Sequence, residues 1–371
     1  MSGTWAIVAG GGTGGHVTPA VAVAQALVAR GHPPDTIHFV GSRRGVEQRM
    51  VPAAGFSLTA LPGRGIERRL SWRALVAAAA LVVGVVAGFL VVARRRPKVV
   101  VSVGGFASVP CALAAAMLRI PLVVVEQNSF PGAANRLVAR FAAACTVAFP
   151  DTPLPRATVC GNPVRRELLE IDRDRDRGAA RDTLGLPHER VVVAVTGGSL
   201  GARRINEAVS EAVAGPLGRD ERLAIHHVVG TRDWPELSTR LPHPPGDGCW
   251  YRAVDYEDRM DALLAAADLF VCRAGASTIF ELAAARLPAV LVPFPGATGD
   301  HQTANARTVV VAGGGVLVPD HELTSERLVA ELWAMVDAPA RLARLGQGMA
   351  SLARPDAADC VAVLVEAHAR G

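Results

Sequence analysis

Short apolar runs rich in β-branched residues recur along the sequence, and stretches with helical periodicity separate them. Runs of this kind, ended by glycine or proline, are typical of strands buried on both faces of a parallel sheet. Their alternation with helices predicts an α/β chain with doubly wound parallel sheets. The predicted strands are Trp5–Ala9, Ile37–Val40, Val99–Val103, Leu122–Val125, Thr146–Phe149, Val191–Val195, Ile225–Val229, Leu269–Cys272 and Ala289–Val292.

Two units of strand, glycine loop and helix give the chain a weak internal repeat. The first runs from Trp5 to His16 and carries Gly-Gly-Gly-Thr-Gly-Gly, and the second runs from Val191 to Ala202 and carries Gly-Gly-Ser-Leu-Gly. With 371 residues, the chain is long enough for two full domains. The repeat predicts two Rossmann-like domains facing a cleft, with the ligand beyond the carboxyl ends of the strands.

The regular pattern pauses after Gly161, and the mixed-charge stretch Asp172–Arg181 that follows has no apolar face. We expect the domain boundary in this region. The predicted N-terminal domain is residues 1–163, and the predicted C-terminal domain is residues 164–354.

Composition narrows the class of partner. The formal net charge is +5, and the 39 basic residues are 38 arginines and one lysine. Because arginine binds phosphate through a bidentate fork, this excess suits a phosphorylated ligand or an acidic membrane surface. The sequence has no basic tail interleaved with aromatic residues, which argues against nucleic acid as a partner. The six cysteines form no Cys-x-x-Cys pair, and we expect them to be buried thiols of a reduced cytoplasm.

One segment has the length of a membrane span. Ala74–Ala93 is twenty residues without a polar side chain. By hydropathy alone, a transmembrane helix and a helix within the domain are equally acceptable. The start of the chain passes straight into a strand, so we expect no signal peptide. The basic residues that flank the segment are Arg64, Arg68, Arg69, Arg73, Arg94, Arg95, Arg96 and Lys98.

Sheet topology favours the helix within the domain. A single span would place Ile37–Val40 and Val99–Val103 on opposite sides of the membrane, although both look like strands of one sheet. We therefore expect a crossover helix packed on the sheet. Its surplus apolar face and flanking arginines could dock on an anionic bilayer without crossing it.

The first glycine loop, Gly10–Gly15, lies between a predicted strand and a predicted helix. Such a loop lets backbone N–H groups approach a diphosphate at the helix N-terminus. A nicotinamide enzyme would use the loop in the same way, but that reading needs an acidic residue after the second strand. Arg43 stands in that region and would suit a 2′-phosphate, so an NADP enzyme stays an alternative. His16 follows the loop directly and is a candidate general base, or an N-cap or phosphate contact, because a helix N-terminus disfavours imidazolium.

Polar residues also end a third strand of the first half. Glu126, Gln127 and Asn128 follow the run Leu122–Val125, so we expect them either to face the cleft or to cap the next helix. Arg165, at the expected domain boundary, is a candidate phosphate clamp or an ordinary salt-bridge residue.

Three segments of the second half carry candidate binding residues. Ser199 adds a hydroxyl to the backbone donors of the second glycine loop. Ala276 lies at the start of a predicted helix, where small residues allow a diphosphate to approach the backbone. Glu281 could accept hydrogen bonds from two ribose hydroxyls. Gln302 and Asn305 lie on one helical face and suit sugar hydroxyls. The His and Asp spacing there does not suit a metal, and we expect no tightly bound metal.

Seven motifs occur in one order along the chain: Gly-Gly-Thr-Gly-Gly-His, Gly-Gly-Phe-Ala-Ser (104–108), Glu-Gln-Asn, Gly-Asn-Pro-Val-Arg, Gly-Gly-Ser-x-Gly-Ala, Arg-x-Gly-Ala-x-Thr and His-Gln-x-x-Asn-Ala. Their order and spacing closely resemble the MurG family of glycosyltransferases. The resemblance extends from about residue 5 to about residue 365. It implies a GT-B fold with UDP-GlcNAc as donor, undecaprenyl-linked muramyl-pentapeptide as acceptor and a β-1,4 link formed with inversion. It also implies a peripheral protein on the cytoplasmic face of the cell membrane, no cofactor, and a C-terminal helix at 355–371 that rejoins the N-terminal domain.

The resemblance assigns substrate contacts motif by motif. The uracil would meet backbone near Tyr256 and Glu257, where the family often has an apolar residue in place of Glu257. Thr13, Gly14 and Gly15 would contact the donor diphosphate or the acceptor, and Asn128 would contact the GlcNAc. Arg165 and Ser199 would contact the nucleotide. The diphosphate and ribose would be bound by Ala276, Ser277, Thr278 and Glu281, and the sugar hydroxyls by Gln302 and Asn305.

The mechanism that the resemblance implies is an in-line displacement. The acceptor 4-hydroxyl attacks the anomeric carbon and UDP leaves. His16 is our first choice for the base and Glu126 our second. Helix N-termini and Arg165 would stabilise the leaving diphosphate.

Two other function classes stay open. One is a different UDP-sugar enzyme, such as a 2-epimerase or a lipid glucosyltransferase. The other is a nucleotide-sugar-binding membrane adaptor without turnover. An apolar helix ringed by arginine favours transfer to a lipid over epimerisation, and polar residues at the expected cleft argue against an adaptor.

Overall fold

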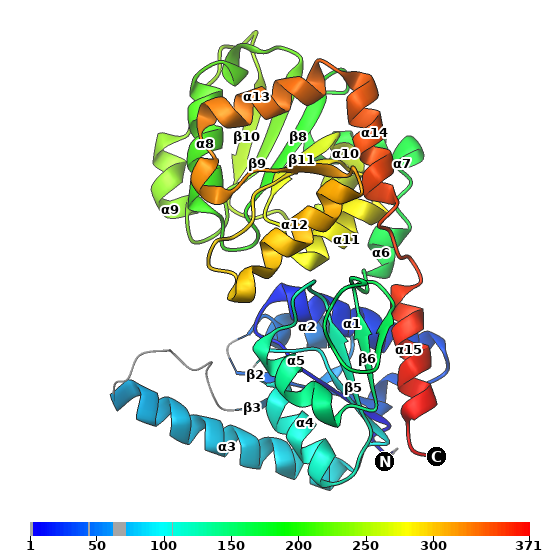
Figure 1. Cartoon of the computed structure of the whole chain (residues 1–371). Helices are drawn as coiled ribbons and strands as arrows, with labels where there is room; N and C mark the ends of the chain where they lie inside the picture. Colours follow the sequence, from blue (N-terminus) through cyan, green and yellow to red (C-terminus); the bar gives the residue numbers. More distant parts are fainter. Residues whose placement is uncertain (1–2, 44, 62–71, 106) are drawn as a thin grey trace. The chain divides into compact units, whose positions relative to one another are not determined.

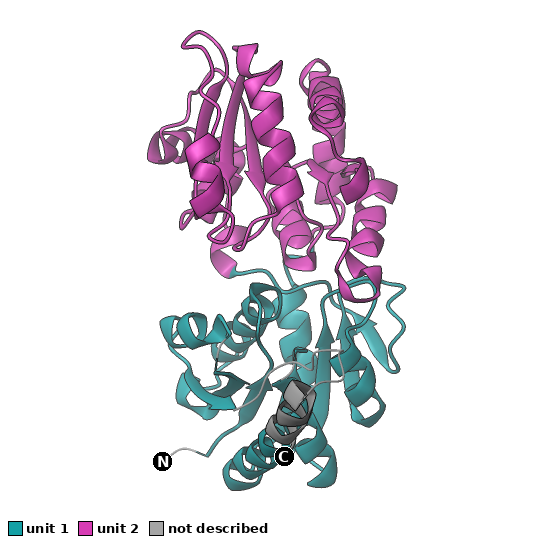
Figure 2. Ribbon diagram, turned by 90° about the vertical axis from the view of Figure 1, so that its left-hand side faces the viewer, with its two compact units in different colours: residues 1–165, 354–371 teal, residues 166–353 magenta. Residues whose placement is uncertain are grey.

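The computed structural model describes residues 3–43, 45–61, 72–105 and 107–371. For residues 72–82 it describes the backbone but not the side chains. The chain folds into two compact units, Met1–Arg165 with Arg354–Gly371 and Arg166–Ala353, coloured teal and magenta in Figure 2. Each unit is built on one parallel sheet with helices on its faces. The predicted α/β class with two doubly wound parallel sheets is therefore confirmed.

The first unit contains a seven-stranded sheet in the order β3-β2-β1-β4-β5-β6-β7. The order reverses between β1 and β4, which are paired in the middle of the sheet. Open α/β sheets bind ligands beyond the carboxyl ends of the strands at such a point. The strands are β1 (Ala6–Ala9), β2 (Ile37–Ser42), β3 (Ser57–Leu61), β4 (Val99–Ser102), β5 (Leu122–Glu126), β6 (Ala144–Val147) and β7 (Ala157–Val159).

Helices cover both faces of this sheet. Ala6 and Val8 of β1 share a core with α1 and α15, whereas Ile7 and Ala9 share another with α4. Burial on both faces is why the central strands read as continuous apolar runs. Figure 1 shows α15, at the end of the chain, beside α1. The helices are α1 (Gly14–Ala29), α2 (Glu47–Ala53), α3 (Trp72–Arg95), α4 (Ser108–Met117), α5 (Ala133–Val138) and α15 (Ala357–His368).

The long apolar segment forms helix α3, which connects β3 to β4, so the predicted crossover helix is confirmed. It packs chiefly on α4 rather than directly on the sheet. Gly88 allows the two helices to approach closely, because a Cβ there would lie 2.5 Å from Cβ of Pro110. Val92 is fully buried in the core that α4 also enters.

The opposite face of α3 is apolar and open to solvent. Val83, Val86 and Leu90 are 54%, 52% and 42% exposed. At the end of the helix and directly after it, Arg94–Arg96 and Lys98 are exposed as well. Arg64, Arg68 and Arg69 lie outside the described residues, as does the side chain of Arg73. Within the part of the chain that the structure describes, no helix has the length and hydropathy needed to cross a bilayer.

The second unit contains a six-stranded sheet in the order β10-β9-β8-β11-β12-β13, which reverses between β8 and β11. Helices α8 and α13 bury one of its faces. The elements are β8 (Val191–Thr196), β9 (Leu223–Val228), β10 (Trp250–Val254), β11 (Leu269–Cys272), β12 (Ala289–Leu291), β13 (Gly315–Leu317), α6 (Arg166–Leu169), α7 (Arg173–Leu184), α8 (Arg203–Ala214), α9 (Trp234–Leu237), α10 (Met260–Ala266), α11 (Ala276–Ala284), α12 (His301–Val311), α13 (Ser325–Val336) and α14 (Pro339–Ala350).

The mixed-charge stretch Asp172–Arg181 folds as helix α7, although it has no apolar face. Arg181 is 1% exposed, and its Nη2 donates to Oδ2 of Asp268 at 2.8 Å. Arg177 pairs with the same carboxylate at 2.6 Å. The helix therefore docks on its unit through arginine side chains that meet a carboxylate, which a search for apolar periodicity does not detect.

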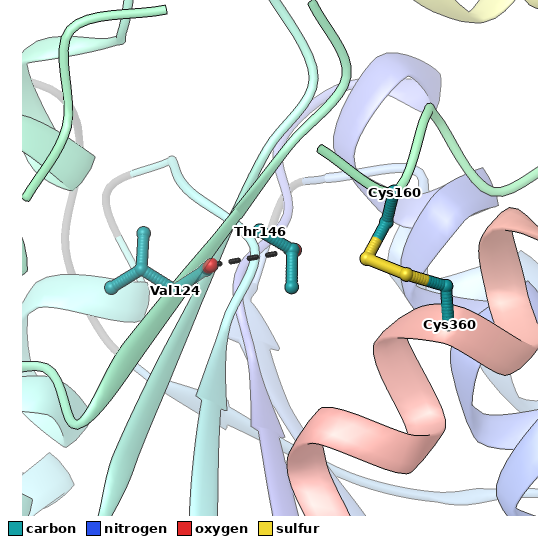
Figure 3. Close-up of a disulfide and its surroundings, with 4 residues drawn as sticks. All are labelled: Val124, Thr146, Cys160 and Cys360. Atoms are coloured by element: carbon teal, nitrogen blue, oxygen red, sulfur yellow. Dashed lines mark hydrogen bonds between the residues drawn. A yellow bond between two sulfur atoms is a disulfide. The ribbon is translucent and has the colours of Figure 1, made fainter. Parts of the chain in front are cut away.

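The expectation that all six cysteines are thiols is wrong for two of them. Cys160, just after β7, and Cys360, in α15, form a disulfide within the first unit (Figure 3). Beside it, the Thr146 hydroxyl donates to the Val124 carbonyl at 3.5 Å and joins β6 to β5. The two cysteines are 200 positions apart, so no local spacing marks the pair in the sequence. The remaining cysteines, Cys111, Cys145, Cys249 and Cys272, are buried thiols.

Candidate active site

Two glycine loops meet at the carboxyl edge of the first sheet, where the strand order reverses. Gly10, Gly11 and Gly12 follow β1 with φ of 153°, 149° and 94°, a region that favours glycine. Gly104 and Gly105 follow β4 with φ of 90° and 80°. A Cβ on Gly105 would overlap the carbonyl oxygen of Gly11, so the two backbones are in contact.

His16 lies at the start of α1, against the second of these loops. Helix α1 begins at Gly14 with Thr13 as its N-cap residue, and Nδ1 of His16 lies 3.1 Å from Oγ1 of Thr13. A Cβ on Gly104 would lie 3.1 Å from the imidazole ring. The structure therefore brings Thr13, the helix N-terminus and the imidazole to one place at the sheet edge.

Glu126 lies at the end of β5 and is buried with its carboxylate fully engaged. Oε1 accepts from the backbone N–H and the side-chain amide of Asn128, at 3.0 and 3.1 Å. Oε2 accepts from the Gly132 N–H at 3.0 Å and from Nδ2 of Asn135 at 2.8 Å. Gln127 is buried too and donates to the carbonyl of Val103 at 3.2 Å. These contacts give Glu126 the geometry of a residue that orients Asn128 and the loop before α5.

Two residues that the sequence did not single out complete this edge. Asn135, on α5, joins Glu126 to the loop of Gly104, because a Cβ on Gly104 would lie 3.3 Å from its Nδ2. Glu47, at the start of α2, accepts a hydrogen bond from the Gly12 N–H at 2.9 Å. Neither residue lies in a motif of recognisable chemistry, so long-range packing alone reveals them.

The second unit repeats the arrangement at the carboxyl edge of its own sheet. Ser199 is exposed in the loop after β8, and its carbonyl accepts from both the N–H and the hydroxyl of Thr231 at 3.1 Å. A Cβ on Gly201 would overlap the carbonyl of Val229. The loop after β9 thus packs against the backbone of the glycine loop, and Ser199 stays at the surface.

Helix α11 follows β11, the strand that pairs with β8 where the strand order of the second sheet reverses. Gly275 is its N-cap residue, and Ala276 is its first residue, followed by half-buried Ser277, Thr278 and Glu281. Its first N–H groups therefore lie where the sequence places a diphosphate.

Gln302 and Asn305 make contacts within the protein that the sequence does not indicate. Asn305 is fully buried, and its Nδ2 donates to the carbonyl of Ala274 at 3.2 Å, so it fixes the turn before α11. Oε1 of Gln302 accepts from the N–H of Phe294 at 2.9 Å.

Glu257, after β10, is held from two sides. It accepts from the Arg259 N–H at 2.8 Å, and its other oxygen lies 3.0 Å from Nε2 of His226. Burial of His226 on β9 lowers its pKa, and the Glu257 carboxylate opposes that shift. Arg165 closes the first segment of the first unit, and its Nε is buried without a hydrogen-bond partner among the described residues. Within the described residues, no cluster of three or more His, Cys, Asp or Glu side chains could hold a metal.

Apart from Arg165, the candidate residues thus fall into two sets, one at the carboxyl edge of each sheet. The first set contains Thr13, Gly14, Gly15, His16, Glu126 and Asn128. The second set contains Ser199, Glu257, Ala276, Ser277, Thr278, Glu281, Gln302 and Asn305.

Comparison with known proteins identifies the family of the chain. Residues 6–147 match the glycosyltransferase family 28 N-terminal domain, and residues 192–361 match the corresponding C-terminal domain. A relative from Clavibacter sepedonicus is 42% identical over 97% of this chain and 95% of its own length. The chain belongs to the MurG family of glycosyltransferases.

Other comparisons agree with this assignment. A relative from a Nocardioides species is 43% identical over 97% of this chain and 96% of its own. Both relatives carry the name UDP-N-acetylglucosamine--N-acetylmuramyl-(pentapeptide) pyrophosphoryl-undecaprenol N-acetylglucosamine transferase. The crystal structure of MurG from Acinetobacter baumannii has a TM-score of 0.75 and 26% identity, covering 98% of this chain and 99% of that one. A UDP-GlcNAc 2-epimerase from Neisseria meningitidis shares the fold at 12% identity, with a TM-score of 0.68 and 98% of each chain covered.

Proposed function

We propose that this chain transfers N-acetylglucosamine from UDP-GlcNAc to the 4-hydroxyl of lipid-linked muramyl-pentapeptide, a step of peptidoglycan synthesis. The proposal rests on two relatives that carry the name of this transferase and are 42% and 43% identical to the chain over 97% of its length. The two sets of residues at the carboxyl edges of the sheets supply the chemistry. Residues 164–354 bind the donor, and residues 1–163 with the C-terminal helix 355–371 bind the acceptor.

The donor site is built on the two loops at the reversal point of the second sheet. The N-terminus of α11, which Gly275 precedes, offers backbone N–H groups to the diphosphate. Ser199 adds its exposed hydroxyl, and Arg165 adds a permanent positive charge for the leaving UDP. Glu281 accepts from the ribose hydroxyls, the backbone by Tyr256 and Glu257 meets the uracil, and Gln302 meets the sugar through its amide nitrogen. Asn305 serves the sugar site indirectly, because its side chain holds the turn at Ala274.

His16 accepts the proton of the attacking hydroxyl. The ring lies in the first turn of α1, beside the Thr13 hydroxyl and the loop of Gly104. Glu126 is the weaker candidate, because four N–H donors already occupy its two oxygens. It acts instead by holding Asn128 toward the GlcNAc. Thr13, Gly14 and Gly15 contact the diphosphate of the acceptor or of the donor.

The acceptor is a lipid, and the exposed face of α3 suits docking on the cytoplasmic face of the membrane. Val83, Val86 and Leu90 supply apolar surface, and Arg94–Arg96 with Lys98 supply positive charge for anionic lipid. Sedimentation with anionic vesicles should be strong in low salt and lost in high salt or mild carbonate. Leu90→Asp should weaken it at least tenfold, whereas Val311→Asp, at an exposed valine of the second unit, should not. Release by detergent alone would contradict peripheral docking.

A UDP-release assay tests the function. Purified protein is incubated with UDP-GlcNAc in the presence and absence of a lipid-linked muramyl-pentapeptide analogue. UDP release that requires the acceptor is the expected result. A 2-epimerase would instead alter UDP-GlcNAc without the acceptor, and a binding adaptor would release no UDP under either condition.

A further inference from the structure

Glu47 is a buried carboxylate at the back of the first glycine loop. Its side chain belongs to the first residue of α2 and is 1% exposed. Oε2 accepts from the backbone N–H of Gly12 at 2.9 Å. Oε1 accepts from the backbone N–H and the hydroxyl of Ser42, both at 2.7 Å. Among the described residues, no arginine, lysine or histidine forms an ion pair with it.

Three glycines make room for this carboxylate. A Cβ on Gly11 or Gly45 would overlap its oxygens, and a Cβ on Gly41 would lie 2.6 Å from its Cγ. Gly11 belongs to the loop after β1, whereas Gly41 and Gly45 come from the end of β2 and the turn after it. Part of the glycine signature of the first loop is therefore required by Glu47, independently of any phosphate.

The contact between Glu47 and Gly12 also determines which backbone N–H groups of the Gly10–Gly15 loop are available to a ligand. A buried carboxylate that lost its donors would be costly, so the bond to the Gly12 N–H is strongly favoured. That N–H points inward and is not available to a diphosphate. The next residues are Thr13 and the first turn of α1, which carries His16. The position of Gly12 thus sets the start of the helix that presents the imidazole.

We propose that Glu47 is a positioning residue for the transfer reaction: it fixes the Gly10–Gly15 loop through Gly12 and thereby holds Thr13 and His16 against the acceptor. This inference rests on the proposed function of the same site. It makes Glu47 distinct from a group that touches substrate, because the carboxylate is covered by its own loop.

The central test is Glu47→Gln. One carboxylate oxygen becomes an amide donor that faces an N–H group, so the contact with either Gly12 or Ser42 is lost. We expect kcat to fall at least tenfold and the KM for the lipid acceptor to rise, while the Kd for UDP-GlcNAc stays within twofold. A merely structural role would change kcat only in proportion to the folded fraction, and that result would overturn the proposal. Glu207→Gln, at an exposed glutamate of α8, is the matched control and should behave as the unaltered protein.

Two further variants keep the test decisive if Glu47→Gln does not fold. Ser42→Ala removes one hydroxyl donor and leaves the Gly12 contact, so we expect less than a threefold loss of kcat. Glu47→Asp is too short to reach both partners, and we expect a loss at least fivefold greater than that of Ser42→Ala. Equal kinetics for the two variants would overturn the proposal.

Hydrogen exchange gives a readout without turnover. In Glu47→Gln or Glu47→Asp, peptides that cover Gly10–Gly15 should exchange at least tenfold faster, while peptides of the second unit stay unchanged. Unchanged exchange of the loop would contradict the inference. Absence of acceptor-dependent UDP release by the unaltered protein would count against the proposed function instead, and the exchange experiment would still judge the role of Glu47 in the loop.

Discussion

Nδ1 of His16 lies 3.1 Å from the hydroxyl oxygen of Thr13, across the first turn of α1. If Nδ1 carries the proton and donates to Thr13, the other ring nitrogen is left as the basic one. Because a hydroxyl both donates and accepts, this contact is compatible with the tautomer whose Nε2 can accept a proton from an attacking hydroxyl. This relationship is the local basis for assigning the base to His16.

His16→Ala tests that assignment. We expect kcat to fall by roughly 10²–10⁴-fold, the usual contribution of a general base, with the Kd for UDP-GlcNAc unchanged. UDP release with the lipid acceptor and equilibrium binding of UDP-GlcNAc measure the two quantities. His243→Ala, at an exposed histidine, is the matched control. Unaltered turnover in His16→Ala would remove the imidazole from the mechanism.

Two buried histidines should make the folded state sensitive to acid. His38 lies 2.7 Å from both the Ser57 and Thr59 hydroxyls, and burial, aided by Arg95, lowers its pKa to about 4. His227 lies 3.0 Å from Tyr251 Oη and Asn206 Oδ1, and burial, aided by His226, lowers its pKa to about 3.

Acid should destabilise the folded state, because both folded-state pKa values lie below the ordinary histidine value of 6.5. The unfolded chain therefore binds more protons than the folded one between about pH 6.5 and 3. Stability from each histidine is complete above pH 6.5 and is lost as the pH falls, by at most about 3 kcal/mol for His38 and about 5 kcal/mol for His227. Urea unfolding at several pH values measures it. His38→Gln should flatten the pH dependence, and an unchanged slope would refute this account.

Arg181 should matter more to stability than its place in a charged stretch suggests. It donates to Asp268 and to the carbonyl oxygens of Ala266 and Pro187, so Arg181→Met removes a donor from each carbonyl, while Arg177 still pairs with Asp268. We expect the second unit to lose about 2–3 kcal/mol of unfolding free energy, because a buried acceptor left without its donor costs about 1–3 kcal/mol. Arg175→Met, on the exposed side of the same helix, should cost less than 1 kcal/mol. Equal losses in thermal and urea unfolding would contradict the buried role.

The disulfide between Cys160 and Cys360 anchors the C-terminal helix to the first unit. In non-reducing buffer, Cys360→Ser should lower the unfolding free energy of that unit by about 2–4 kcal/mol. With a strong reductant present, the variant and the unaltered protein should match. Thiol titration of the denatured, unreduced protein should find four thiols. Six titrating thiols would show that the bond does not form.

The sequence predicted the central strands well and the edge strands poorly. Each of the nine apolar runs overlaps an observed strand, although the run Thr146–Phe149 is displaced from β6 (Ala144–Val147). The strands that it did not indicate, β3, β7, β10 and β13, lie at the four edges of the two sheets. One face or one side of an edge strand meets solvent, so its residues need no continuous apolar run. In β7, for example, every residue is exposed.

The site divides in a similar way. Glycine loops and polar residues at strand ends were visible in the sequence because their chemistry is local. Glu47 was not visible, because its role depends on Gly12, which lies 35 positions away. The inward orientation of Asn305 and the four-fold engagement of Glu126 likewise arise from contacts that only the folded chain creates.

The most direct test of the central claim is to follow donor and acceptor in one reaction. Purified protein is given UDP-GlcNAc and a lipid-linked muramyl-pentapeptide, and released UDP and the mass of the lipid product are measured together. We predict that each UDP released corresponds to one N-acetylglucosamine gained by the lipid. Consumption of UDP-GlcNAc with no gain in lipid mass, or no consumption at all, would contradict the account.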